Sequence, residues 1–425
     1  MSFWLEPELQ RYFDIDATGL PPPMRQEAPN PLQASPLFPS GNSAKSANYL
    51  AELKEKVTAA LADDPALSFL LRLDNVLDSR DGVITCVATV RRNVHYQELQ
   101  YLQRFKQVAE PAIRIPTNKE QMLQCLDPRT LRCGQQVLLK VHARAHPAEP
   151  LQLLREWAIL RAVQDPSAFP RPYLFGCLGN DCWRVVSENK NDDRQLVLHR
   201  QHFLLCQYVE DSLQRVINGN RASVKCLDSP AAVRLCRDML NKVGQLHNSG
   251  WSHGCLQPSS FELLGSDEML LADFASAEPL TRNCLIYRGE RERSLVYGAV
   301  RFSPNVKLEA PYADLESLVY IACSLMSPKH LPWESVDSAL PNEAAVSAHK
   351  QAVWKFVDEH SATNSESAED LWRQWQLNEV FNCSSAAQVG ELPAFRLASG
   401  ILQAYREKVD GELPNCSALL DTLRS

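Results

Sequence analysis

The sequence is notable first for what it lacks, beginning with any stretch that could cross a membrane. No apolar run reaches the roughly 18 to 20 residues that a membrane-spanning helix needs. The opening Met1-Ser2-Phe3-Trp4 does not show the charged and then apolar order of a signal peptide. Basic residues are not in excess either: the formal net charge is -7, whereas broad nucleic-acid binding usually requires a basic surface. We therefore expect an intracellular protein with no membrane partner and no direct evidence for a nucleic-acid partner.

Paired cysteine motifs are also missing. The 13 cysteines are scattered and odd in number, and most stand in apolar surroundings. Cys177 and Cys182 are five positions apart, which is not the spacing of a zinc site. We expect buried free thiols, as in a reducing compartment. The sequence does not decide between nucleus and cytoplasm, because no lysine-arginine cluster supports nuclear import.

Residues 1–45 lack the composition of a packed core. Pro, Ser and Asn dominate between Leu20 and Ser46, which favours a disordered leader. A short amphipathic motif precedes this stretch, and its apolar side chains fall on or next to one helical face. It can pack back onto its own domain or bind a partner protein. Its residues are Phe3, Trp4, Leu5, Leu9, Tyr12 and Phe13.

Beyond the leader, periodicity predicts a β-rich part followed by a larger helical part. A helix is expected over 47–62, and helical periodicity returns after Val141. Residues 95–134 read as an insertion that contains a helix over 98–108, since a structureless loop of that length is unusual. From Ser212 on, the chain is mostly helical. Strands are expected over 70–77, 82–91, 135–141, 183–187 and 196–208.

Three motifs occur in the order in which a protein kinase carries them. Val137-Leu138-Leu139-Lys140 resembles the strand whose lysine reaches the nucleotide phosphates, and Glu156 is the expected helical partner of Lys140. The segment from Trp251 to Ser260 stands in place of the catalytic loop. Leu271-Ala272-Asp273-Phe274-Ala275 stands in place of Asp-Phe-Gly. Together these motifs resemble the protein kinases, which implies an α+β fold of two lobes.

The resemblance narrows to the casein kinase one group, through Gly298 to Asn305, Ala313 to Leu318 and Leu331-Pro332-Trp333-Glu334. Within that group the chain resembles the vaccinia-related kinases. They carry His-Gly-Asp in the catalytic loop, and His253-Gly254 matches the first two residues of that motif. They also share the motif His330 to Glu334 and a hinge segment similar to Phe203 to Ile217. The resemblance implies a kinase-like domain over 46–425, with an N-lobe over 66–210 and a C-lobe over 211–425.

The same resemblance shows which chemistry is missing. Phosphoryl transfer needs a carboxylate that receives the substrate proton and ligands for the metal that neutralises the phosphates. The catalytic-loop aspartate of the family is Cys255 here, the lysine is Gln257 and the metal-binding asparagine is Ser260. Loss of a general base alone typically costs on the order of 10²- to 10⁴-fold in rate. We therefore predict no intact catalytic site.

Nucleotide binding stays open at this stage. Lys140, Glu156 and Asp273 are retained, and Asp273 could hold one Mg²⁺. However, the segment Val76 to Ile84, which matches the phosphate loop, has one glycine and two acidic residues that would repel phosphate. The alternative is a purely structural role, in which Lys140 and Glu156 form an ion pair and Asp273 forms hydrogen bonds with backbone groups. ATP and Mg²⁺ are the cofactors that the resemblance implies, and none is required.

A structural role is also expected for two residues of the predicted C-lobe, which follow a loop that contains several arginines. By the resemblance, Asp314 and Arg301 tie the activation segment to the helix behind it. The loop between Ala275 and Val300 is expected to be solvated, or else to dock an acidic or phosphorylated partner. Its arginines are Arg282, Arg288, Arg291 and Arg293.

The sequence thus predicts a pseudokinase, an inactive kinase-like protein that serves as an interaction or allosteric scaffold for other proteins. One alternative is a nucleotide sensor that binds ATP without hydrolysis. Another is a weakly active, atypical serine/threonine protein kinase that uses Asp273 as its centre and whose turnover Asp273→Asn would abolish. The predicted recognition surfaces are the leader motif, the helix of the insertion and the groove of the C-lobe.

Overall fold

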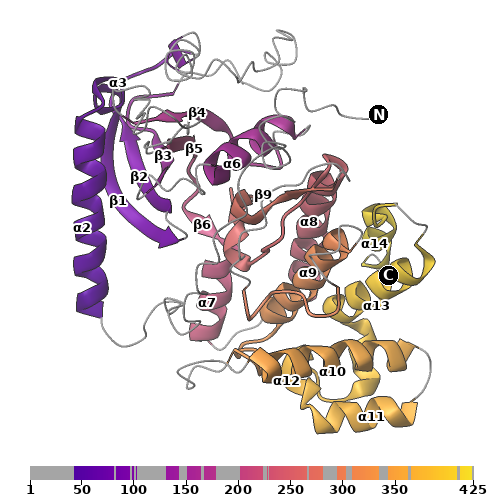
Figure 1. Ribbon diagram of the computed structural model, residues 1–425. Helices are drawn as coiled ribbons and strands as arrows, with labels where there is room; N and C mark the ends of the chain where they lie inside the picture. The colour runs from indigo at the N-terminus through magenta and orange to yellow at the C-terminus, as the bar shows by residue number, and fades with distance from the viewer. Residues whose placement is uncertain are drawn as a thin grey trace, which may run out of the picture. The chain divides into compact units, whose positions relative to one another are not determined.

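The computed structural model describes most of the chain beyond the first forty residues, in two compact units (Figure 1). Unit 1 comprises residues 1–161, 170–208 and 284–287, and unit 2 comprises 162–169, 209–283 and 288–425. The described residues are 43–80, 83–95, 98–99, 102, 131–142, 151–163, 167–178, 202–223, 227, 229–265, 268–280, 294–302, 309–334, 343–361, 365–408 and 412–423.

Unit 1 is built on one antiparallel sheet of five strands in the order β1-β2-β3-β5-β4. Strands β2 and β3 pair directly, although the expected insertion separates them in sequence. Strand β2 is rich in the β-branched residues that suit a pleated surface, since six of its eight residues are Val, Ile or Thr. The strands are β1 (Leu71–Arg80), β2 (Val83–Val90), β3 (Gln136–His142), β4 (Pro172–Cys177) and β5 (His202–Gln207).

The two faces of this sheet have different partners. Helix α2 (Ser43–Ala62) lies along β1 and buries Leu53, Val57 and Leu61 in a core with alternate sheet residues such as Cys86 and Leu139 (Figure 1). Helix α6 (Leu151–Ala162) lies on the opposite face, from which the Lys140 side chain projects to reach Glu156 of α6. A short helix, α3 (Pro65–Leu70), leads into β1. It begins at Asp64, whose carboxylate accepts the backbone N–H of Leu67 at 3.1 Å.

Unit 2 is mostly helical and is centred on α9 (Ala310–Met326), every residue of which is buried. Helices α8 (Ser229–Asn248) and α13 (Pro393–Glu407) pack against α9, as Figure 1 shows. A helix that is apolar almost all round belongs in the middle of a core, which is where α9 lies. The remaining helices are α7 (Leu213–Ser223), α10 (Glu343–Ser361), α11 (Ser365–Gln374), α12 (Leu377–Phe381) and α14 (Cys416–Thr422).

Short strands and turns fill the first part of unit 2. Strands β6 (Asp211–Ser212), β8 (Phe261–Leu263) and β9 (Met269–Leu271) form one small sheet. A second sheet pairs β7 (Trp251–Ser252) with β10 (Glu278–Pro279). The 3-10 turns are η3 (Pro258–Ser260), η4 (Phe274–Ser276) and η5 (Ala386–Glu391).

The structure thus shows the expected mixed α+β class, with a small antiparallel sheet and a larger helical part. It changes some expected boundaries. Residue 70 ends a helix instead of starting a strand, and β1 continues to Arg80, three residues beyond the expected end. The strand expected over 183–187, most of 95–134 and the first six residues of 196–208 lie outside the described residues.

Candidate functional site

Lys140 and Glu156 form a buried ion pair in unit 1. The Lys140 Nζ lies 2.6 Å from the Glu156 Oε1, and the two residues are 8% and 3% exposed. Strand β3 supplies the lysine and α6 the glutamate, and Trp157 fixes α6 by stacking on Phe175 of β4. The pair that the sequence predicts therefore exists, and it joins the helix to the middle of the sheet.

Two histidines continue the same sheet face. His142 follows Lys140 on β3, and its ring lies edge-on to His202 of β5 with centroids 6.0 Å apart. His202 in turn stacks on Phe175. Burial, with a smaller effect of His202, lowers the pKa of His142 to about 4. The histidine is therefore neutral at ordinary pH, and no feature of the sequence flagged it.

The segment that was expected to match a phosphate loop belongs largely to strands β1 and β2. Their ladder continues through Ser79↔Ile84 to Arg80↔Val83. The backbone N–H of Ser79 bonds to the Asp78 carboxylate at 2.7 Å. Between 76 and 80 this segment is therefore strand, with one N–H already donated to an acidic side chain.

In unit 2, Asp314 holds the start of the loop for which the sequence predicts a likeness to a catalytic loop. Its carboxylate accepts the backbone N–H groups of His253 at 2.7 Å and Gly254 at 2.8 Å. His247 Nε2 donates to the same carboxylate at 3.0 Å. Asp314 is 2% exposed, so three donors satisfy a charge that would be costly to bury alone.

The three degenerate positions of this loop contact one another. The Gln257 amide donates to the Cys255 Sγ at 3.4 Å, and the Gln257 backbone N–H donates to the Ser260 hydroxyl at 3.3 Å. Cys255 and Gln257 are half-buried and Ser260 is buried. None of the three side chains carries a carboxylate. These three side chains are neutral groups that bond to one another, while the Asp314 carboxylate holds the start of the loop at 253–254.

Asp273 lies beside this loop in an uncommon backbone conformation. Its φ of 65° and ψ of 64° are left-handed, a region that few residues other than glycine occupy. The neighbouring Ala272 fixes the position: its N–H donates to the Ser260 carbonyl at 2.8 Å, and its carbonyl accepts from His253 Nε2 at 2.9 Å. The structure thus brings Cys255, Gln257, Ser260 and Asp273 into one connected segment.

A different carboxylate holds the segment 294–302. Glu316 of α9 accepts the backbone N–H groups of Val300, Arg301 and Phe302 at 2.8 to 3.1 Å. Burial raises the pKa of Glu316, and the Tyr320 hydroxyl, which donates to it, opposes that rise. The expectation for Asp314 is corrected here: its role is structural, but it holds the loop at 253–254, and Glu316 holds 300–302.

Two more side chains anchor this segment from its other side. Lys350 of α10 is 1% exposed and donates to the carbonyls of Leu295 and Gly298 at 2.8 and 2.7 Å. The Trp333 indole donates to the Val296 carbonyl at 2.9 Å. Burial lowers the pKa of Lys350 to about 7, with Glu316 acting in the opposite direction. The sequence analysis predicted a role for neither Glu316 nor Lys350, because a charged residue within a helix is usually expected to face solvent.

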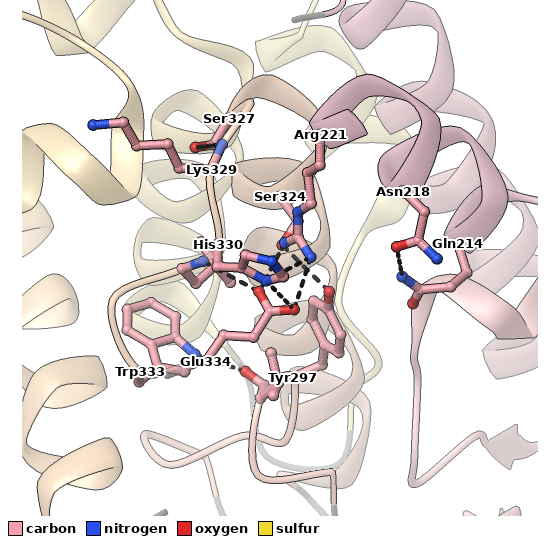
Figure 2. A network of polar contacts seen from close by, with 12 residues as sticks. Gln214, Asn218, Arg221, Tyr297, Ser324, Ser327, Lys329, His330, Trp333 and Glu334 are labelled. Carbon is pink, nitrogen blue, oxygen red and sulfur yellow. Dashed lines mark hydrogen bonds and ion pairs between the residues drawn. The ribbon is translucent and has the colours of Figure 1, made fainter. Parts of the chain in front are cut away.

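Figure 2 shows how the loop after α9 is fixed to α7. Arg221, near the end of α7, donates through both guanidinium nitrogens to the two carboxylate oxygens of Glu334, at 2.8 and 2.7 Å. Glu334 also accepts the Leu331 N–H at 3.1 Å, and His330 Nδ1 lies 3.2 Å from it. The motif from His330 to Glu334 therefore makes a bidentate lock on α7.

Several predicted residues fall outside the described part of the chain. These are the leader motif (Phe3, Trp4, Leu5, Leu9, Tyr12 and Phe13) and the loop arginines Arg282, Arg288, Arg291 and Arg293. Of the predicted nucleotide-binding residues, Lys140 and Glu156 belong to unit 1 and Asp273 to unit 2.

No protein-family model matches the chain, and no curated protein matches it. Among the described residues, no cluster of three or more His, Cys, Asp or Glu side chains could hold a metal ion. Within those same ranges, no helix has the length and apolarity needed to cross a membrane. Eight of the described cysteines form no disulfide, and four of these, Cys86, Cys206, Cys236 and Cys323, are buried.

Proposed function

We propose that the chain is a pseudokinase of the vaccinia-related branch of the casein kinase one group, and that it works by binding other proteins. The observation that carries the proposal is the loop from Cys255 to Ser260. Its three polar positions hold a thiol, an amide and a hydroxyl that contact one another. A thiol accepts a hydroxyl proton poorly, and a serine is a weaker metal ligand than an asparagine.

The rest of the geometry supports a scaffold. Backbone donors and acceptors across 295–302 are held by Glu316, Trp333 and Lys350, all of which are buried. Unlike a loop that is ordered by phosphorylation, this segment is ordered by side chains of the chain itself. A segment fixed in this way offers a constant surface to a partner without a nucleotide or a modification.

The α+β chain would then have two kinase-like lobes and need neither ATP nor Mg²⁺. The acidic β1–β2 hairpin supports this reading, because Asp78 and Asp81 would repel phosphate. The proposal places the protein inside the cell, in the nucleus or the cytoplasm, with other proteins as its partners.

One observation favours the nucleotide sensor as a second candidate. Asp273 keeps a left-handed backbone, and such strain often marks functional positions. Lys140 and Glu156 also remain paired. A sensor would bind ATP without transferring its phosphate and would change its affinity for a partner on binding.

A thermal-shift measurement on the full chain separates the two candidates. ATP, with and without Mg²⁺, is added to the natural chain and to Lys140→Ala, and each shift is taken against the same variant without nucleotide. The scaffold predicts no rise at millimolar ATP. Binding at 100 times Kd would add about 2.7 kcal/mol. A clear rise that Lys140→Ala removes would replace the scaffold with the sensor.

A further inference from the structure

An exposed aromatic side chain in unit 1 lies next to several arginines. Phe69, at the end of α3, is 65% exposed, the highest fraction among the large apolar side chains that the structure describes. The Arg92 guanidinium lies 4.9 Å from the centre of its ring. The Arg91 backbone N–H donates to the Leu70 carbonyl at 2.8 Å, which places the backbone of Arg91, just after the end of β2, against the residue that follows Phe69.

A fourth member comes from the far side of the expected insertion. Val94 pairs with Leu131, and the Cys133 thiol donates to the Arg91 carbonyl at 3.1 Å, so Arg132 is held close to Arg91. We call Phe69, Arg91, Arg92 and Arg132 the arginine–aromatic patch. The patch lies at one end of the unit 1 sheet, where β1 begins and β2 ends.

Two of its charges are not compensated. Arg92 is paired with Glu98, but Arg91 and Arg132 are exposed and make no ion pair with another described residue. An exposed ring under one guanidinium group, with two further exposed arginines on the neighbouring backbone, suits a ligand that has both aromatic side chains and carboxylates. Arginine stacks on aromatic rings and makes bidentate contacts with carboxylates.

The chain itself contains a segment with this chemistry. Residues 3–16 include four aromatic residues and four acidic residues, with Arg11 as the one basic residue. We propose that residues 3–16 dock on the arginine–aromatic patch of the same molecule. The aromatic residues are Phe3, Trp4, Tyr12 and Phe13, and the acidic residues are Glu6, Glu8, Asp14 and Asp16. This inference does not depend on the proposed lack of catalysis.

The connecting chain has a suitable length. Helix α2 begins at Ser43, and its 20 residues extend about 30 Å along the sheet toward α3. The roughly 26 residues between residue 16 and Ser43 are rich in proline, and a linker of this kind spans about 3.1 Å per residue, or about 80 Å when fully extended. The linker is therefore long enough to pass the length of α2 and reach the patch, and a tether of this kind can supply an effective concentration on the order of 1 mM.

Amide hydrogen exchange on the full chain tests the docking. A segment that docks with a dissociation constant on the order of 0.1 mM would exchange about tenfold more slowly than a free one. We expect that protection over residues 3–16 in the natural chain. We expect its loss in Phe69→Ser and in the double variant Arg91→Glu/Arg132→Glu. Tyr49→Ser and Arg234→Glu are the matched controls, since both side chains are exposed and lie outside the patch.

Exchanging the charges of the segment and the patch distinguishes direct pairing between them from a general loss of structure. Glu6→Arg/Glu8→Arg should lose the protection, and combining it with Arg91→Glu/Arg132→Glu should restore it. Thermal melting identical to that of the controls verifies that each variant is folded. Three results would overturn the proposal: no protection in the natural chain, protection that survives the patch variants, or a combined variant that stays unprotected. Protection that rises with protein concentration would assign the contact to a second copy and would also overturn it.

Discussion

Lys140 donates to Glu156 across 2.6 Å, from a central strand to the helix on that face, with both side chains buried. Removing one member leaves the other as an uncompensated buried charge, whereas replacing both with apolar residues is often neutral. The pair is therefore a structural tie whether or not a nucleotide ever reaches it.

Replacing one residue of this pair should lower the stability of the fold much more than replacing both. We expect Lys140→Met to lower the free energy of unfolding by about 3 to 5 kcal/mol, and Lys140→Met/Glu156→Leu to recover most of that loss. Urea denaturation of the full chain measures both. A single variant as stable as the natural chain would contradict the buried tie.

Asp314 should be intolerant of a change that keeps its shape. Asp314→Asn removes the charge and replaces one acceptor oxygen with an NH₂ group, although three donors point at this carboxylate. We expect a loss of about 1 to 3 kcal/mol, which is the usual cost of a buried donor without a partner. Denaturation is compared with Asp370→Asn on the exposed face of α11, which should change stability little. Equal effects of the two variants would contradict the role of Asp314.

Glu316 should control the local order of the segment 294–302. In Glu316→Gln one acceptor oxygen becomes a donor, so the N–H groups of Val300, Arg301 and Phe302 lose part of their partner. We expect faster amide exchange at those three residues, by about tenfold for each 1.4 kcal/mol lost locally. Exchange in the β2–β3 ladder of unit 1 serves as the internal control. Unchanged exchange at 300–302 would show that other contacts hold the segment.

His142 should make the protein sensitive to acid. Its pKa is lowered to about 4 in the folded chain, from about 6.5 when unfolded. Between these values the unfolded chain binds the proton and the folded chain does not, so stability falls as the pH falls from about 6.5 to 4. The full loss is about 3 kcal/mol.

The check is denaturation at several pH values across that window. His142→Phe should flatten the pH dependence, while His95→Gln, a change at an exposed histidine, should leave it in place. A natural chain whose stability follows the same slope as His142→Phe would show that His142 does not carry the effect.

The sequence predicted the parts of the fold that rest on strong local periodicity. The strand around Lys140 and the helix of Glu156 are where the apolar pattern placed them, and the pair itself was expected from the resemblance to the protein kinases. The helix over 47–62 was expected, but its packing against the sheet was not. An apolar helix face predicts that the face is buried, but it does not indicate which surface buries it.

The buried charges were the least predictable part of the site. Glu316 and Lys350 each sit within a helix and look like solvated residues by local pattern. Their roles depend on backbone groups of residues 295–302, which come from another part of the chain. Likewise, Asp314 was expected to hold the segment before α9, but it is Glu316, two residues later, that accepts the N–H groups of 300–302. Side chains at these neighbouring positions point to different sides of the helix.

A phosphoryl-transfer assay is the most direct test of the proposed lack of catalysis. The full chain is incubated with Mg²⁺ and ATP labelled in the γ-phosphate, with serine- and threonine-containing protein substrates, beside the Asp273→Asn variant. We expect no transfer above the blank from either protein, because Cys255, Gln257 and Ser260 would supply neither the proton acceptor nor the metal ligand. Transfer by the natural chain that Asp273→Asn abolishes would contradict this expectation and would identify an active enzyme.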